Sequence, residues 1–286
     1  MSDTPAPSVD DSAADFIERG QRAAAKGDWK TAVTAWIAGS NAGSLESANL
    51  VLTAVPPLKA QADEGDIGAQ ALLAGVMLDF FQESALPVAL VYATAAARAG
   101  HPAAQRTLGV MYRTGQGVAT DMRQAEVLFT AAARAGDAYA AFNLAGMHIT
   151  GDVEVRDHDQ CLRLLRQAVS EGVTEAAAVL GDRLAAVDED AEALDWYLYA
   201  AQRGHAGCMF AAGCSYRDGL GTAPDPVQAV RWFLAMLDKG NGDGIHEAIQ
   251  LAKQDMTEEQ IRTAGQLASR PSEAETLIRT ARKLGG

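Results

Sequence analysis

Residues 101–136 read HPAAQRTLGVMYRTGQGVATDMRQAEVLFTAAARAG, and versions of this segment recur on both sides of it. Its final glycine returns at spacings of 36, 36, 32 and 36 residues, as Gly100, Gly136, Gly172, Gly204 and Gly240. A small residue precedes each of these glycines by eleven positions, at Ala89, Ala125, Cys161, Ala193 and Ala229. Self-similarity at a nearly fixed period predicts a repeat architecture, in which each unit packs on its neighbours.

The internal pattern of this segment predicts its local structure. Apolar residues lie at helical intervals in two stretches, 102–113 and 122–135, with the glycine-containing sequence GQGV between them. Asp121 stands just before the second stretch with Gln124 three residues later, which is typical of a helix N-cap. Gly136 predicts the end of the second helix, because glycine adopts a positive φ without steric cost. Each repeat is therefore expected to be a helix, a loop, a second helix and a turn.

The residues of this unit also carry a family resemblance. LGVMYRTGQGVATDMRQAEVLFTAAARAG resembles a Sel1-like repeat, a relative of the tetratricopeptide repeat with a longer, glycine-containing loop, and residues 211–240 are the second-best copy. Other copies depart from the pattern: His148 replaces the usual tyrosine, Val153 replaces the second loop glycine, and residues 177–204 have a loop four residues shorter. The resemblance implies an all-α fold, a right-handed α/α superhelical solenoid, whose members mostly act as adaptors and scaffolds for other proteins.

The pattern divides the chain into four expected regions. They are a disordered N-terminal tail (1–11), divergent N-terminal helical repeats (12–64), a Sel1-like repeat core (65–240) and C-terminal capping helices (241–286). The divergent region is expected to begin with helices at 13–26 and 29–41 and to continue with a compressed repeat at 45–64. The cap is expected to hold helices at 243–254 and 272–284, with Thr257 and Gln260 as a capping box.

Composition limits the classes of partner and compartment. The chain has 286 residues, 48% of them hydrophobic but only 6% aromatic, which predicts a core built largely from alanine. A formal net charge of −13 argues against nucleic-acid and anionic-membrane partners, because the protein has no general basic field. We expect neither a secretory signal nor a membrane-spanning segment, since no long apolar run occurs. Three cysteines fit a reducing compartment, and a cytoplasmic location is expected.

Candidate catalytic and metal-binding groups are few. The sequence has no Ser-x-x-Lys, Gly-x-Ser-x-Gly or Walker A motif, and the glycine pair of GQGV fits the loop of the repeat. A cluster of metal-binding residue types occurs at Asp157, His158, Asp159 and Cys161, but most of it lies at or beside an expected N-cap. Cys161 occupies the small core position and is expected to be buried, and His148 is favoured as a core histidine. We expect no metal and no cofactor.

A partner-binding surface is expected on the first helices of the repeats, which line the concave face in tetratricopeptide-like superhelices. The packed stripe of Leu108, Gly109 and Tyr112 fixes which positions point inward, and the repeat spacing transfers that register to the other copies. The predicted partner-binding residues are Arg106, Val110, Arg113, Tyr139, Phe142, Phe210 and Arg217. Aromatic and arginine side chains dominate interface hot spots. An equal alternative is that these aromatic side chains pack between neighbouring repeats.

Three functions follow from this reading. The favoured one is a non-enzymatic scaffold that holds a segment of a partner protein, with an acidic or C-terminal carboxylate end, in a bacterial regulatory, secretion-linked or immunity role. The alternative is an enzyme of the penicillin-binding or β-lactamase-like type reported for some secreted Sel1-like proteins. The absence of a serine–lysine pair and of paired cysteines argues against that alternative. The third is self-association of the solenoid into a homo-oligomer.

Overall fold

The computed structural model describes residues 12–81, 83–153, 157–240, 242–254 and 256–285. The regular structure of these residues is entirely helical, as expected for an α/α solenoid. The chain forms two compact units, residues 1–156 and 157–286, and each is described by itself. The expected tail at residues 1–11 lies outside the described residues.

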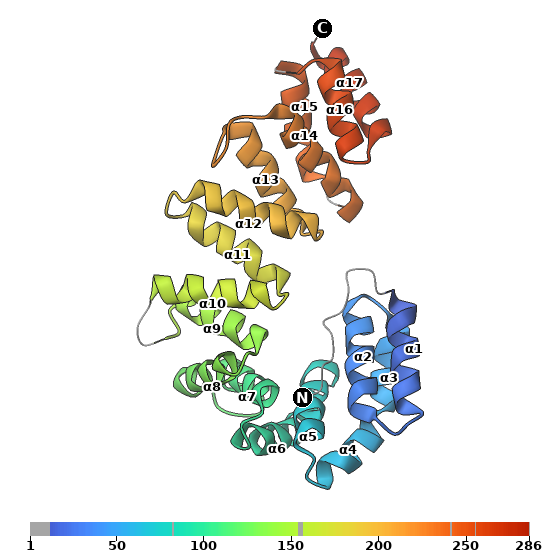
Figure 1. The fold of residues 1–286 in the computed structure, drawn as a ribbon, viewed down its shortest axis with the longest axis vertical. Coiled ribbons are helices and arrows are strands. Elements are labelled where there is room, and N and C mark those ends of the chain that lie inside the picture. The colour runs from blue at the N-terminus through green and yellow to red at the C-terminus, as the bar shows by residue number, and fades with distance from the viewer. Residues whose placement is uncertain (1–11, 82, 154–156, 241, 255, 286) are drawn as a thin grey trace. The chain divides into compact units, whose positions relative to one another are not determined.

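Unit 1 is built from helices that follow one another along the chain (Figure 1). They are α1 (Ala13–Ala24), α2 (Trp29–Asn41), α3 (Leu45–Thr53), α4 (Val55–Asp63), α5 (Ile67–Phe80), α6 (Leu86–Arg98), α7 (Pro102–Thr114), α8 (Met122–Arg134) and α9 (Ala138–Thr150), with the short 3₁₀ helix η1 (Glu83–Ala85) before α6.

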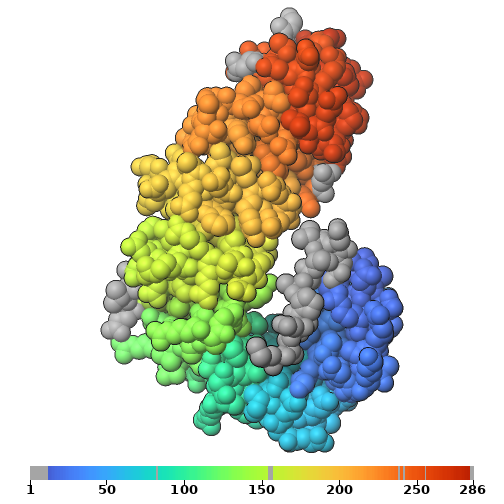
Figure 2. Space-filling view, in the orientation of Figure 1, coloured from blue at the N-terminus to red at the C-terminus, as the bar shows by residue number. Residues whose placement is uncertain are grey.

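Unit 2 continues the same alternation of first and second helices (Figure 1). Its helices are α10 (His158–Ser170), α11 (Thr174–Ala185), α12 (Asp190–Gln202), α13 (Ala206–Asp218), α14 (Pro226–Ala235), α15 (Asp243–Gln254), α16 (Glu258–Leu267) and α17 (Pro271–Gly285), with the 3₁₀ helix η2 (Met236–Lys239) after α14. In the space-filling view the colours follow one another as bands within each unit, because segments that are close in sequence are also close in space (Figure 2).

The expected helix signals are confirmed. The Asp121 carboxylate accepts a hydrogen bond from the Gln124 N–H at 3.0 Å, and Asp157 does the same for Gln160 at 2.9 Å. Thr257 and Gln260 form the reciprocal capping box. The repeat-ending glycines all have a positive φ, from 68° to 95°, at Gly100, Gly136, Gly172, Gly204 and Gly240. The initial and final helices also begin and end within two residues of their expected positions.

Close approach of the two helices of a repeat explains the alanine-rich core. Gly213 of α13 lies against Phe233 of α14, and a Cβ built on this glycine would be 2.4 Å from the aromatic ring. The same contact joins Gly109 to the fully buried Phe129 in the repeat of α7 and α8. One glycine therefore makes room for one large side chain, and small residues line most of the remaining helix–helix surface.

The loop inside the repeat is built the same way in both units. Gly115 and Gly117 have φ values of 74° and 71°, and Gly219 and Gly221 have 75° and 71°. The loop closes when the N–H of the following aspartate donates to a tyrosine carbonyl, at 2.9 Å from Asp121 to Tyr112 and at 2.7 Å from Asp225 to Tyr216. The second helix thus starts from a fixed point at the end of the first.

Candidate functional site

The face of α7 carries three of the predicted partner-binding residues. Arg106, Val110 and Arg113 are spaced by four and three residues, so they share one side of this helix. The Arg106 Nε donates to a carboxylate oxygen of Asp137 at 3.1 Å. Its guanidinium carbon lies 5.7 Å from the ring centroid of Tyr139 on α9. Arg106 and Tyr139 are therefore neighbours, and the Tyr139 residue is 55% exposed.

Arg113 contacts a carboxylate of the following repeat. Its Nη2 is 3.7 Å from an Asp152 oxygen, at the end of α9. The guanidinium passes over Gly146, where a Cβ would be 3.9 Å from the Arg113 Nη1. Phe142 and Val110 are half-buried on the same helices. This surface of unit 1 thus combines an exposed aromatic ring with arginines that already contact carboxylates of the following repeat.

One aspartate in this surface has two roles. The Asp137 Oδ1 accepts the Ala140 N–H at 2.8 Å as the N-cap of α9, while the carboxylate also pairs with Arg106. The arrangement recurs earlier in the unit, where the Asp66 Oδ1 caps α5 and its Oδ2 accepts from the Lys30 Nζ at 2.6 Å. The hydrogen bond from Lys30 holds the pKa of Asp66 below its ordinary value. We call these two arrangements the cap bridges.

Unit 2 holds the remaining predicted residues on α13. Phe210 and Arg217 are seven residues apart and so share one side of the helix. The Phe210 ring lies 5.7 Å from the ring of the buried Phe233, so Phe210 packs within its own repeat. Arg217 pairs with Asp218 through two hydrogen bonds and with Glu247 of α15. These hydrogen bonds raise the pKa of Arg217 above its ordinary value.

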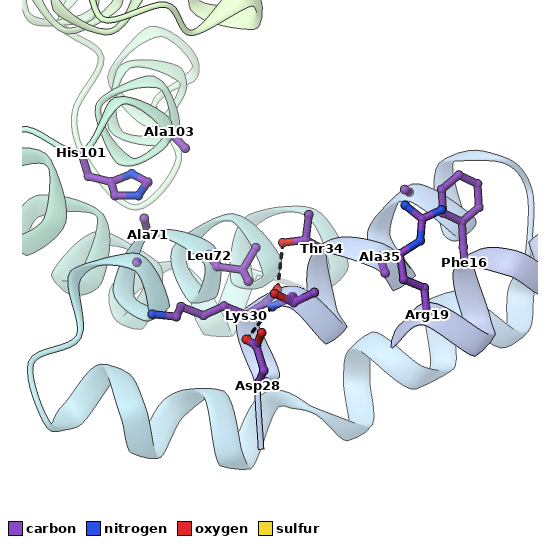
Figure 3. A pocket seen from close by; sticks show the side chains of 13 residues that line it. Phe16, Arg19, Asp28, Lys30, Thr34, Ala35, Ala71, Leu72, His101 and Ala103 are labelled. Atoms are coloured by element: carbon purple, nitrogen blue, oxygen red, sulfur yellow. Dashed lines mark hydrogen bonds between the residues drawn. The ribbon is translucent and has the colours of Figure 1, made fainter. Parts of the chain in front are cut away.

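A cavity of about 630 Å³ opens in unit 1 between α1, α2, α5 and α7 (Figure 3). Phe16 and Arg19 come from α1, Leu72 comes from α5, and His101 precedes α7. The full lining is Phe16, Arg19, Asp28, Lys30, Thr31, Thr34, Ala35, Ala38, Gly68, Ala71, Leu72, His101 and Ala103. None of the predicted partner-binding residues on α7 and α9 lines this cavity.

Sequence reasoning missed this cavity because eight of its thirteen lining residues come from the divergent N-terminal region. Their register could not be transferred from the regular copies. The sequence did hold one indication that α2 and α5 are neighbours. Lys30 and Asp66, which form an ion pair, are 36 residues apart, and this is the length of the regular repeat. His101 directly follows the repeat-ending Gly100, so its sequence position indicates only a turn residue.

Two residues of the sequence cluster of metal-binding types, Asp157 and Cys161, have structural roles. Asp157 is the N-cap of α10. Cys161 is 3% exposed, and burial raises the pKa of its thiol, as expected for a small core residue. His148 is also buried. Within the described parts of the chain, no three His, Cys, Asp or Glu side chains are grouped closely enough to hold a metal ion. None of the helices described here combines the length and apolar character needed to cross a bilayer.

Comparison with known proteins connects this architecture to one family. The Sel1 repeat model matches residues 102–137, 138–173, 183–205 and 206–241. No curated protein sequence matches the chain. The third matched segment is shorter than the others, in agreement with the short turn before α12.

Solved structures show the same fold at low sequence identity. A Sel1 repeat protein from Oxalobacter formigenes has a TM-score of 0.58 and 18% identity, covering 93% of this chain and 96% of that one. A protective antigen of uropathogenic Escherichia coli with an SLR fold has a TM-score of 0.56 and 21% identity, covering 96% of this chain and 72% of that one. Sel1-repeat proteins generally serve as scaffolds for protein interactions. The matched repeats, the two-helix units and the recurring loop together identify four Sel1 repeats in this chain.

Proposed function

We propose that this protein is a non-enzymatic scaffold that binds a segment of a partner protein on the first-helix face of unit 1. We define this face by Arg106, Val110, Arg113, Tyr139 and Phe142. The observation that carries the proposal is the exposed Tyr139 ring with the Arg106 guanidinium beside it. An aromatic ring next to an arginine can contribute apolar contact and hydrogen bonds at one point of an interface.

The contacts of Arg106 support an acidic partner segment. A guanidinium has five N–H donors in a planar fork, and the bond to Asp137 uses the Nε. The two Nη groups are suited to a carboxylate of the partner, which would bind them in a bidentate manner. Asp137 remains the cap of α9 in this arrangement, so binding does not require the helix to lose its N-terminal hydrogen bond.

The proposal gives Phe210 and Arg217 in unit 2 a smaller part. Phe210 already packs on Phe233, and Arg217 is held by two carboxylates. We infer a bacterial cytoplasmic adaptor with a regulatory, secretion-linked or immunity role. The three cysteines, none of which forms a disulfide, fit a reducing compartment.

The test is affinity capture from a bacterial lysate with three baits. They are the wild type, the Arg106→Gln/Tyr139→Ala variant, and a control with Arg123→Gln and Arg134→Gln, two exposed arginines of α8. We expect a protein captured by the wild type and the control to be lost from the first variant. Each bait is also melted, because a variant that unfolds would lose every partner. Identical captured sets for three folded baits would contradict the proposal.

A further inference from the structure

A carboxylate without a partner lies beside the first-helix face of unit 1. Asp79 belongs to the last turn of α5, and α5 packs against α7, the helix that carries Arg106. The Asp79 residue is exposed. Within the described residues, no hydrogen bond or ion pair joins its carboxylate to another side chain. This group is therefore accessible to a partner that binds on the face.

The position of Asp79 in its helix is unfavourable for a negative charge. Partial negative charge gathers at a helix C-terminus, because the carbonyl groups of the last turn have no intrahelical donor. No basic side chain lies in the last turn of α5 to compensate. The Asp79 carboxylate is thus repelled by the helix that carries it. Local rules of this kind are broken most often at functional sites.

The same repeat position in unit 2 shows how such a charge can be balanced. Asp79 and Asp218 each stand 14 residues after the glycine that ends the preceding repeat. Asp218 accepts hydrogen bonds from the Arg217 Nε and Nη2 at 2.7 and 2.6 Å, and these bonds lower its pKa. Leu78 occupies the place of Arg217 in α5. Asp79 therefore lacks the cation that its counterpart has.

The surroundings of Asp79 reduce its hydration. Burial raises the pKa of its carboxyl although the residue is exposed, and the charge of Arg106 opposes this shift. A group that reaches solvent but is poorly hydrated lies in a recess of the surface. Salt screens an ion pair in such a recess less than a pair on open surface.

Arg106 does not balance Asp79 by itself. Its Nε donates to Asp137 at 3.1 Å, so one guanidinium serves two carboxylates of the chain. If the partner segment adds its own aspartate or glutamate at the Nη groups, three carboxylates share a single cation. A lysine or arginine in the same segment restores the balance, and Asp79 is the exposed carboxylate with which it can pair.

We propose that Asp79 selects a lysine or arginine of the partner segment. This cation pairs with the Asp79 carboxylate, while an acidic residue of the same segment pairs with Arg106 and an apolar residue contacts Tyr139. The inference rests on the proposed scaffold function and deepens it, because it defines the partner as a segment with charges of both signs. The three residues come from α5, α7 and α9, which are consecutive first helices in contact with one another.

The probe is a phage-displayed library of 12-residue peptides selected on the full wild-type chain. We expect the enriched peptides to contain both an aspartate or glutamate and a lysine or arginine. Enriched acidic peptides without a shared basic residue would overturn this inference and leave the scaffold function standing. No enrichment at all would contradict both.

A double-mutant cycle identifies the partner of Asp79 in the best peptide, with binding measured by fluorescence anisotropy. Asp79→Asn and replacement of the basic peptide residue by glutamine should each weaken binding about tenfold, and together should weaken it no further. Asp79→Glu keeps the charge and should stay within about threefold of the wild type. The control Asp195→Asn removes an exposed carboxylate of α12 and should leave Kd within about twofold. Additive losses would refute the pairing.

Charge reversal is the sharpest test. Asp79→Lys should weaken the original peptide about a hundredfold and should bind a peptide with glutamate in place of the basic residue within about fivefold of the original affinity. Loss of both complexes by a folded Asp79→Lys variant would overturn the proposal. Loss of the original peptide in Arg106→Gln/Tyr139→Ala but not in Asp79→Asn would keep the scaffold function and reject the role of Asp79. The opposite result would keep Asp79 as a contact and reject the face defined around Arg106 and Tyr139.

Thermal stability separates a binding role from a structural one. Because the unpaired carboxylate stands at the unfavourable end of α5, Asp79→Asn should leave the melting temperature unchanged or raise it by about 1–3 °C. A lower melting temperature would show that Asp79 supports the fold, and would overturn the proposal. In the wild type, the peptide should also lower the pKa of the Asp79 carboxyl, followed by ¹³C NMR, because a nearby cation favours the charged form.

Discussion

The complete repeats α7–α8 and α13–α14 differ from the shortened repeat α11–α12 in their loop but share the contact between their helices. The two complete repeats use a pair of positive-φ glycines in the loop, whereas the short turn has Asp188 at φ 64°. The glycine–aromatic contact persists in all three, as Gly109 on Phe129, Gly213 on Phe233 and Gly181 on Tyr197. The contact that joins the two helices of a repeat is therefore independent of the loop.

The loop has a different role, which is to contact the preceding repeat. A Cβ on Gly221 would be 2.2 Å from the carbonyl oxygen of Asp190, at the start of α12. A Cβ on Gly117 would be 3.1 Å from the Cβ of Leu86, at the start of α6. In both units the second loop glycine thus rests on the second helix of the repeat before it. A repeat that lacks the loop lacks this contact.

The largest effect is expected for Gly221→Ala. The new methyl group would overlap the backbone of Asp190 and would also hold a positive φ, so we expect a loss of about 3 kcal/mol in local stability. Hydrogen exchange measured by mass spectrometry should show faster exchange of amides in α12, although the substituted residue lies outside this helix. Unchanged protection of α12 would show that the loop does not support the preceding repeat.

The helix–helix contact is tested by Gly213→Ala and Gly181→Ala. Each adds a methyl group within 2.6 Å of an aromatic ring, and overpacking of this kind costs about 2 kcal/mol. The two losses should be equal, although only the repeat of Gly213 has the long loop. Phe233→Leu should recover at least half of the Gly213→Ala loss in a double-mutant cycle of urea denaturation. Additive losses would refute direct contact as the cause.

A smaller effect is expected for Gly117→Ala. Its nearest neighbour, the Leu86 Cβ, is 3.1 Å away, compared with 2.2 Å for Gly221, so the main cost is the positive φ of 71°, about 1 kcal/mol. Gly117→Ala should therefore speed amide hydrogen exchange in α6 less than Gly221→Ala speeds it in α12. Equal effects would mean that backbone conformation alone, and not the contact with the preceding repeat, sets the cost of these substitutions.

The smallest effect concerns the cap bridge between Lys30 and Asp66, at a boundary that has no long loop. The pKa of Asp66 is depressed in the folded state, so its stabilisation is present above the unfolded pKa of about 3.9 and is lost as the pH falls through the folded value. Because both side chains are partly exposed, the pair contributes below about 1 kcal/mol. Lys30→Gln should lower the melting temperature slightly at pH 6 and leave it unchanged near pH 2. An equal loss at both pH values would exclude the ion pair as the source.

The fold could be predicted from local signals because each repeat carries them in full. Asp121, Gly136 and their counterparts act within one turn of helix, so their spacing determines where helices begin and end. The cap bridges could not be predicted in the same way. Arg106 and Asp137 are 31 residues apart, and nothing in the local pattern of either residue shows that they meet.

The predicted binding residues illustrate the same limit. Repeat register predicts that Arg106, Val110 and Arg113 share one side of a helix, but it could not show that the arginines contact Asp137 and Asp152. Nor could it show that Phe210 packs on Phe233. Whether these residues bind a partner stays a prediction. The cavity escaped prediction because most of its lining residues belong to the divergent N-terminal region, where the repeat spacing does not set the register.

The cap bridges have a direction along the chain. In both of them the cation precedes the carboxylate in sequence, as Lys30 precedes Asp66 and Arg106 precedes Asp137. A ribosome therefore releases the cation before the aspartate that starts the next first helix. The cation that contacts the N-cap aspartate of each of these helices is therefore synthesised before the helix itself. At these two boundaries of unit 1, synthesis from the N-terminus therefore supplies the cation before the helix start that it contacts.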